Sequence, residues 1–272
     1  MKKVLIAFDN GHFSKGAFEF ARRLNELQPI LLTGVFLPNV DYNVLTYAYG
    51  GTLPVVPFIE GYDPELVEQQ VNVFEEACVH HHIEFRTHKD RYDFALPELR
   101  KETRFADLLL LGSEKFYANI GTASPNEYLR LALHEAECPV ILAPEEFAFP
   151  QSNVLAYDGS DDAAFAIKSF CGLFPELCAN TTILVYASAK DKAGMPDLDY
   201  IKELSARHFS DLRLHILEAD PKKYFDTWIS DIKDPILVCG SFGRSGISEL
   251  FRHSFVSEVV SDHRVPVFIA HR

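Results

Sequence analysis

The sequence lacks any apolar run close to the roughly 20 residues that a membrane-spanning helix needs. Its opening run, VLIAF, reaches Asp9 too soon to form the apolar core of a secretory signal. Basic residues are also scarce, because 26 Lys and Arg stand against 39 Asp and Glu, for a formal net charge of −13. Sequence-independent nucleic-acid binding depends on basic side chains that neutralise phosphates. We therefore expect a cytoplasmic protein with no membrane and no nucleic-acid partner.

Cysteine pairs and the best-known catalytic motifs are missing as well. The five cysteines are scattered, without a CxxC pair, and we interpret them as structural thiols in a reducing compartment. The sequence has no GxxxxGK(S/T), no GxGxxG after a predicted first strand and no GxSxG. These absences argue against a P-loop ATPase, a nicotinamide enzyme and a serine hydrolase. We assign no catalytic residue and expect a binding protein with, at most, slow ATP hydrolysis.

The chain contains an internal repeat in a composition typical of folded proteins. Of its 272 residues, 47% are hydrophobic and 24% are charged. The N-terminal stretch KKVLIAFDNGHFSKGAFEFARRL resembles SNVLAYDGSDDAAFAIKSFCGLF after the midpoint, so that Asp9 corresponds to Asp158. The stretch DLLLLGS likewise matches DPILVCGS and aligns Gly112 with Gly240. The repeat predicts two domains, at residues 1–146 and 152–272.

Each half predicts a doubly wound, mostly parallel five-stranded sheet of the α/β class. Continuous apolar runs alternate with amphipathic stretches, as in strands covered on both faces and joined by helices. The expected strands lie near residues 3–8, 30–36, 83–87, 108–111 and 140–143, and near 154–157, 182–186, 212–217, 236–239 and 267–270. Ligands of such Rossmann-like sheets bind outside the carboxyl ends of the strands. Both repeat-related aspartates and both repeat-related glycines fall at such ends.

The stretch GSFGRSGISELFRHS, residues 240–254, directly follows a predicted strand. Gly240 permits a turn, and Gly243 permits a close backbone approach to a ligand. Ser254 opens a helix-like segment whose first amides attract anions, and Arg244 adds a positive charge. The stretch therefore predicts a phosphate-binding loop, with a turn that binds no ligand as the alternative.

Together with Asp158, this pattern resembles that of the universal stress proteins, and the whole chain resembles a tandem, UspA-like member of that family. Nucleotide-binding members carry G-x2-G-x9-G-(S/T) after the fourth strand and an Asp at the end of the first. Gly240, Gly243 and Ser254 match this pattern, whereas His253 replaces the third glycine. The resemblance implies an adenine nucleotide, ATP or AMP with or without magnesium, and a role as sensor or regulator in a stress response.

The resemblance also implies an adenine nucleotide alpha hydrolase-like fold whose two halves pack as an intramolecular pseudo-dimer through antiparallel last strands. Pairing of chains into a homo-oligomer stays open. Asp158 would lie near the ribose or adenine, strand-end backbone near the base, and the glycine loop around the phosphates. The implied nucleotide-binding residues are Ala156, Tyr157, Asp158, Val185, Tyr186, Ala187, Cys239, Gly240, Ser241, Gly243, Arg244, His253, Ser254 and Phe255.

The first half departs further from the pattern, because Lys115 stands where the second half has Gly243. We expect a second site that is degenerate for ATP. Its remaining residues are Phe8, Asp9, Gly112 and Ser113.

Several features also have interpretations that involve no nucleotide. Asp158 could cap the turn that follows it. The long segment 38–65 could cover the protein as a lid or contact partners, which makes a nucleotide-free scaffold the alternative function. The run His80–His82 and the nearby His88 invite a metal, but consecutive residues do not share a helix face, and we assign no metal site. His12 lies near Asp9, as in an acid/base pair, but no nucleophile motif accompanies them, and we assign no catalytic role to this pair.

Overall fold

A computed structural model describes residues 1–9, 12–37, 64–89, 95–117, 127–187, 195–217, 225, 228–240, 259 and 262–271. Residues 38–63, most of the long segment expected to act as a lid or partner surface, lie outside the described residues. The chain divides into two compact units, Met1–Cys138 and Pro139–Arg272. Among the described helices, none is long and apolar enough to cross a membrane.

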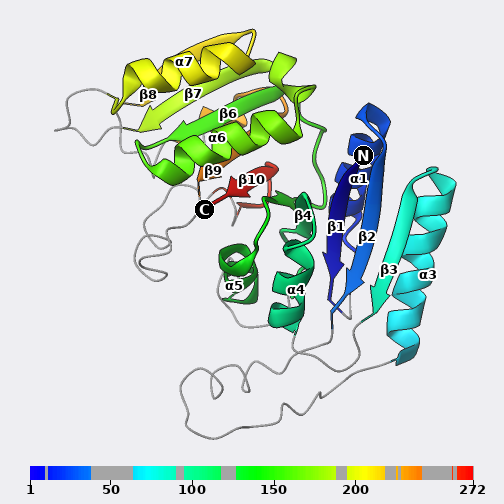
Figure 1. Ribbon diagram of the computed structural model, residues 1–272. Helices are drawn as coiled ribbons and strands as arrows, with labels where there is room; N and C mark the ends of the chain where they lie inside the picture. Colours follow the sequence, from blue (N-terminus) through cyan, green and yellow to red (C-terminus); the bar gives the residue numbers. More distant parts are fainter. Residues whose placement is uncertain are drawn as a thin grey trace, which may run out of the picture. The chain divides into compact units, whose positions relative to one another are not determined.

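The first unit holds four parallel strands in the order β3-β2-β1-β4 (Figure 1). These are β1 (Lys2–Phe8), β2 (Ile30–Phe36), β3 (Glu84–Lys89) and β4 (Leu108–Gly112). The described helices of this unit are α1 (Lys15–Leu27), α3 (Pro64–His80), α4 (Ala95–Thr103) and α5 (Glu127–Glu135). All of β4 is buried, as its run LLLLG predicts, whereas β3 at the edge alternates between half-buried and exposed residues.

The second unit holds six strands in the order β5-β10-β9-β6-β7-β8. They are β5 (Val140–Ala143), β6 (Ser152–Tyr157), β7 (Thr181–Ala187), β8 (Leu212–Leu217), β9 (Pro235–Gly240) and β10 (Val267–Ala270). Helices α6 (Asp161–Leu173) and α7 (Leu198–His208) and the short 3-10 helix η1 (Leu177–Ala179) accompany them. All neighbouring pairs are parallel except β5 with β10, which run antiparallel.

The fold class and all ten expected strands are confirmed, with ends that differ by at most two residues. The antiparallel pairing of the two last strands, implied by the family resemblance, is also confirmed. This pairing explains why the division between the compact units falls before β5, since β5 is bonded to a strand of the second repeat. The repeat boundary between residues 146 and 152 stays a prediction.

Helices α1 and α6, which follow the first strand of each repeat, begin with the same cap. The Oγ atom of Ser14 accepts a hydrogen bond from the backbone N–H of Ala17 at 3.2 Å. The Oγ atom of Ser160 accepts one from the N–H of Ala163 at 3.1 Å. Each serine satisfies an amide that the first helical turn leaves without a partner, so the sequence fixes where both helices start.

Strand β9 ends directly against the first turn of α6. A Cβ atom added to Gly240 would lie 2.4 Å from the backbone nitrogen of Ala163 and 2.5 Å from the carbonyl carbon of Asp162. Both atoms belong to a helix backbone, which cannot move aside as a flexible side chain could. Gly240 is therefore required by helix packing, whatever ligand the edge of the sheet binds.

We predict that Gly240→Ala destabilises the protein by about 1 to 3 kcal/mol, because the added methyl group overpacks the contact between β9 and α6. The measurement is the midpoint of urea unfolding. The matched control is Gly172→Ala in the same helix, where an added Cβ meets no atom within 4 Å. That variant should unfold at an equal or higher urea concentration, since alanine loses less entropy in a helix. Equal midpoints for both variants would contradict the packing argument.

A second prediction concerns Glu137, which joins the end of α4 to the chain after α5. Hydrogen bonds from Arg104 and then Arg100 lower the pKa of Glu137 from its ordinary 4.5 to about 2. A lowered folded-state pKa stabilises the protein above the unfolded value and loses that effect as pH falls towards the folded value. The stability difference between wild type and Glu137→Gln, measured by urea unfolding, should therefore shrink below about pH 4.5. A constant stability difference across this pH range would contradict the argument.

Candidate functional site at the carboxyl ends of β6, β7 and β9

The second unit reverses its strand order at β6. From β6 the chain proceeds through β7 to β8 on one side, and then continues with β9 and β10 on the other. In such sheets, the carboxyl ends beside the reversal leave the crevice where ligands bind. Tyr157, the last residue of β6, is in register with Tyr186 of β7, and β9 ends on the other side of β6 at Gly240. The structure thus brings together the expected residues of β6, β7 and β9.

Asp158 projects its carboxylate into solvent immediately after β6. Its Oδ1 atom accepts a hydrogen bond from the backbone N–H of Ser160 at 2.9 Å, which confirms that it caps the turn into α6. Gly159 completes this turn with φ +88°, and a Cβ there would lie 2.9 Å from Pro196. Among the described residues, the Oδ2 atom of Asp158 has no hydrogen-bond partner. One carboxylate oxygen therefore holds the turn, and the side chain as a whole is exposed.

Tyr157 adds a polar group beside this carboxylate. Burial, followed by the negative charges of Asp197 and Asp158, raises the pKa of Tyr157. Its hydroxyl therefore stays protonated at neutral pH and is able to donate a hydrogen bond. Asp197 lies just before α7 in left-handed backbone. No sequence pattern signals its approach to Tyr157, because that approach depends on tertiary packing.

Other expected site residues have side chains directed into the protein. Ala156, Val185 and Cys239 are buried within their strands. Burial and the nearby charge of Asp158 raise the pKa of Cys239, and its sulfur lies 3.6 Å from the carbonyl oxygen of Phe268. The side chains of these three residues therefore do not face a ligand, and a ligand contact through their backbone, or through Ala187 at the end of β7, stays a prediction. Outside the described residues lie Ser241, Gly243, Arg244, His253, Ser254 and Phe255, which stay predictions.

The equivalent aspartate of the first half points inward. Asp9 is 7% exposed, and its two oxygens accept backbone hydrogen bonds from His12 at 3.0 Å and from Tyr117 at 2.8 Å. Tyr117 follows β4 in left-handed backbone, with φ 53°. The carboxylate thus bonds to an amide in the segment after β4, the segment that corresponds to the glycine-rich stretch of the second half. No local pattern in the sequence signals this bond, which joins residues 108 positions apart.

The rest of the first-half site is filled by aromatic side chains. The ring of Phe8 stacks on Phe13 at 5.2 Å and on Phe36 at 5.1 Å between centroids. Phe8 and Phe36 hold the register positions that Tyr157 and Tyr186 hold in the second half. Ser113, the residue that follows β4, is buried. Where the second half has tyrosine hydroxyl groups at its strand ends, the first half has a cluster of phenylalanine rings, and the degenerate site stays a prediction.

The histidines do not assemble a metal site among the described residues. The rings of His80 and His81 lie 4.7 Å apart at the exposed end of α3, and His88 pairs with Glu102 at 2.5 Å. Within the described part of the chain, no three histidine, cysteine or acidic side chains lie close enough together to hold a metal ion.

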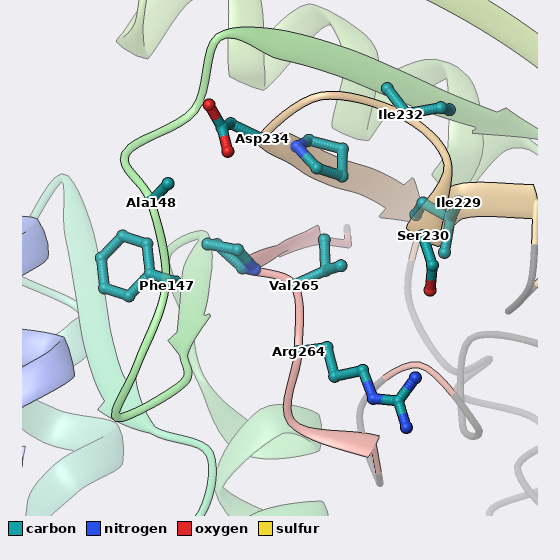
Figure 2. Close-up of a pocket in the computed structure, with 10 residues that line it drawn as sticks. Phe147, Ala148, Ile229, Ser230, Ile232, Asp234, Arg264 and Val265 are labelled. Carbon is teal, nitrogen blue, oxygen red and sulfur yellow. The ribbon is translucent and has the colours of Figure 1, made fainter.

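A cavity of about 290 Å³ lies at the opposite edge of the second unit, at the amino ends of β9 and β10 (Figure 2). Its lining is Phe147, Ala148, Ile229, Ser230, Ile232, Asp234, Pro235, Arg264, Val265 and Pro266. Figure 2 shows Arg264 extending away from Asp234, and its Nε lies 4.0 Å from Asp262. The cavity lies at the amino ends of the strands, whereas Asp158 lies at the carboxyl ends. The guanidinium of Arg264, which lines the cavity, is paired with the carboxylate of Asp262.

The fold is that of the universal stress proteins. A universal stress protein from Archaeoglobus fulgidus matches with a TM-score of 0.71 and 17% identity, over 99% of this chain and 98% of its own. A protein assigned as a universal stress protein, from Pseudomonas aeruginosa, matches with a TM-score of 0.56 and 13% identity, over 100% and 93%. No protein-family model and no curated protein sequence matches this chain. The likeness noted in the sequence is thus confirmed at the level of the fold.

We predict that the two repeat-related aspartates differ in their contribution to stability. Asp9→Ala should lower the free energy of unfolding by at least about 2 kcal/mol, because a buried amide of Tyr117 and a half-buried amide of His12 lose a charged acceptor. Asp158→Ala should lower it by less than about 1 kcal/mol, because its one bond is exposed. Urea unfolding of both variants makes the comparison. Equal losses would show that Asp158 has the same structural role as Asp9.

Proposed function

We propose that the C-terminal half binds an adenine nucleotide, ATP or AMP, and acts as a nucleotide-dependent sensor or regulator in a stress response. The observation that carries the proposal is the outward carboxylate of Asp158 at the point where the strand order reverses. A carboxylate with one outward oxygen accepts hydrogen bonds from the ribose hydroxyls, which stay neutral at physiological pH. The likeness to universal stress proteins adds a fold in which this edge is the expected ligand crevice.

The adenine base would lie against the end of β7. Backbone groups from Val185 to Ala187 that strand pairing leaves open at this end would read an adenine edge. The protonated hydroxyl of Tyr157 supplies another donor beside Asp158. The equivalent place in the first half is occupied by the stacked rings of Phe8, Phe13 and Phe36, so the second half is the better candidate for the base.

The phosphates would lie against the glycine-rich stretch 240–254 rather than against α6. The first turn of α6 carries Asp161 and Asp162, whose charges oppose an anion at that helix terminus. Gly243, Arg244 and Ser254 supply a close backbone approach, a positive charge and a hydroxyl instead. A magnesium ion bound with the nucleotide would reduce the repulsion from the two carboxylates.

A nucleotide-free scaffold is the second candidate function. Two residues of the nucleotide motif have structural roles that need no ligand, because Asp158 caps its turn and Gly240 packs on α6. These roles favour the scaffold. In this alternative the chain acts through protein partners, with segment 38–65 as the contact surface.

We predict that freshly purified protein releases ATP or AMP when denatured, or takes up added ATP at millimolar concentration with magnesium. Chromatography with mass spectrometry identifies the released molecule, and calorimetric titration measures uptake. Gly243→Lys, which copies Lys115 of the first half, should weaken binding by at least about tenfold, a change of about 1.4 kcal/mol. The matched control is Gly172→Lys, which adds the same charge at an exposed position of α6 and should bind like wild type.

A wild-type protein that releases no nucleotide and takes up none would contradict the proposal and leave the scaffold. Binding that survives Gly243→Lys and is lost in Asp9→Ala, with the fold verified by circular dichroism, would move the site to the first half.

A further inference from the structure

The cavity at the amino ends of β9 and β10 is built from three segments of the second unit (Figure 2). Residues 147 and 148 belong to the chain before β6, residues between 229 and 235 lead into β9, and residues 264–266 lead into β10. Its volume of about 290 Å³ is close to the lower end of the range for small-molecule pockets, which is about 300 to 1,000 Å³. The cavity therefore suits a small molecule rather than a nucleotide or a protein segment.

Backbone hydrogen bonds hold these segments in place. The carbonyl of Asp234 accepts from the N–H groups of Gln151 at 2.9 Å and Ser152 at 3.2 Å, which joins the chain before β6 to the start of β9. The N–H of Leu237 donates to the carbonyl of Pro266 at 3.0 Å, which joins β9 to the start of β10. The cavity is therefore formed by the fold itself and does not depend on a ligand for its shape.

The walls of the cavity are mostly apolar. Ile229 and Val265 are buried, and the ring of Phe147 is half-buried. Pro235 and Pro266 have no backbone N–H. The walls therefore suit an apolar body, and the two prolines offer no backbone donor to an anion.

The two charged residues of the lining differ in how their charges are compensated. Arg264 extends away from Asp234, and its Nε atom lies 4.0 Å from the Oδ2 atom of Asp262 (Figure 2). Asp234 is half-buried, and its carboxylate has neither a hydrogen-bond partner nor an ion-pair partner among the described residues, which include the neighbouring Lys233. Within this part of the chain, the negative charge of Asp234 is therefore left uncompensated. The net charge of −13 adds to the attraction for a cation.

We propose that this cavity binds a small organic ammonium ion with an apolar body. The apolar body contacts Phe147, Ile229 and Val265, and the N–H groups of the ammonium donate to the carboxylate of Asp234. Hydrogen bonds between two charged groups are stronger than those between neutral groups, and a carboxylate only accepts them. The site does not depend on the nucleotide proposal, because Asp158 lies at the opposite edge of the sheet.

The test uses three probes that share one aromatic body and differ in charge. Phenethylamine is positive at neutral pH, phenethyl alcohol is neutral and hydrocinnamate is negative. Calorimetric titration of the full-length protein measures their affinities, and the fluorescence of Trp228, the sole tryptophan and the neighbour of Ile229, reports binding at the cavity. We expect the amine to bind at least about fivefold more tightly than the alcohol, because it adds one partly buried ion pair. Hydrocinnamate should bind more weakly than both, because Asp234 repels it.

Two variants locate the ammonium at Asp234. Asp234→Asn removes the charge, keeps the shape of the side chain and tolerates the left-handed backbone at this position, where φ is 44°. It should weaken binding of the amine by at least about fivefold and leave the affinity for the alcohol unchanged. The matched control, Asp231→Asn, removes an exposed carboxylate from the same turn but outside the lining. This control should bind the amine like wild type.

Three results would overturn the proposal. The first is that none of the probes binds, or that the alcohol or the acid binds as tightly as the amine. The second is that Asp234→Asn keeps the wild-type affinity for the amine. The third is that AMP displaces the amine, which would place the ammonium at the nucleotide edge. A protein that binds the amine and no nucleotide would contradict the proposed function and leave this inference standing.

Discussion

The close approach of β9 to the first turn of α6 organises the second unit. It depends on Gly240, because a side chain there would overlap the helix backbone. With its first turn fixed, α6 packs along β9 and β10, where the ring of Phe170 meets Phe268 at 5.4 Å. The same helix therefore has two fixed ends, about 20 Å apart for its 13 residues. The turn of Asp158 precedes one end, and the short helix η1 follows the other.

The two halves use one scaffold in different ways. Both place an aspartate after their first strand and begin the next helix with a serine cap. In the first half, three more residues separate the aspartate from this serine, and the carboxylate turns inward to the segment after β4. In the second half the shorter turn keeps the carboxylate at the surface, bonded to its own turn. A difference in loop length thus accompanies the difference between a buried carboxylate and an exposed one.

The sequence was sufficient to predict the strands and not the partners of the site residues. Apolar runs located β4 and β9 because both strands are covered on each side. The start of β6 was placed two residues late, since Ser152 and Asn153 are polar yet buried, with Asn153 bonded to Leu177 and Thr182. The bond between Asp9 and Tyr117 and the effect of Asp197 on Tyr157 depend on the folded chain. Neither a local motif nor periodicity records such contacts.

The bond from Asp9 to Tyr117 also bears on what the second half needs. In the first half, a carboxylate of the chain itself satisfies an amide of the segment after the fourth strand of the repeat. In the second half, the described hydrogen bond of Asp158 comes from the N–H of Ser160, within its own turn. For residues 240–254 we propose that a phosphate of the nucleotide is the anion that these amides bind. Backbone N–H groups at a strand end donate hydrogen bonds to a carboxylate or to a phosphate, because both supply negatively charged oxygen acceptors. A single geometry would then serve stability in one repeat and recognition in the other.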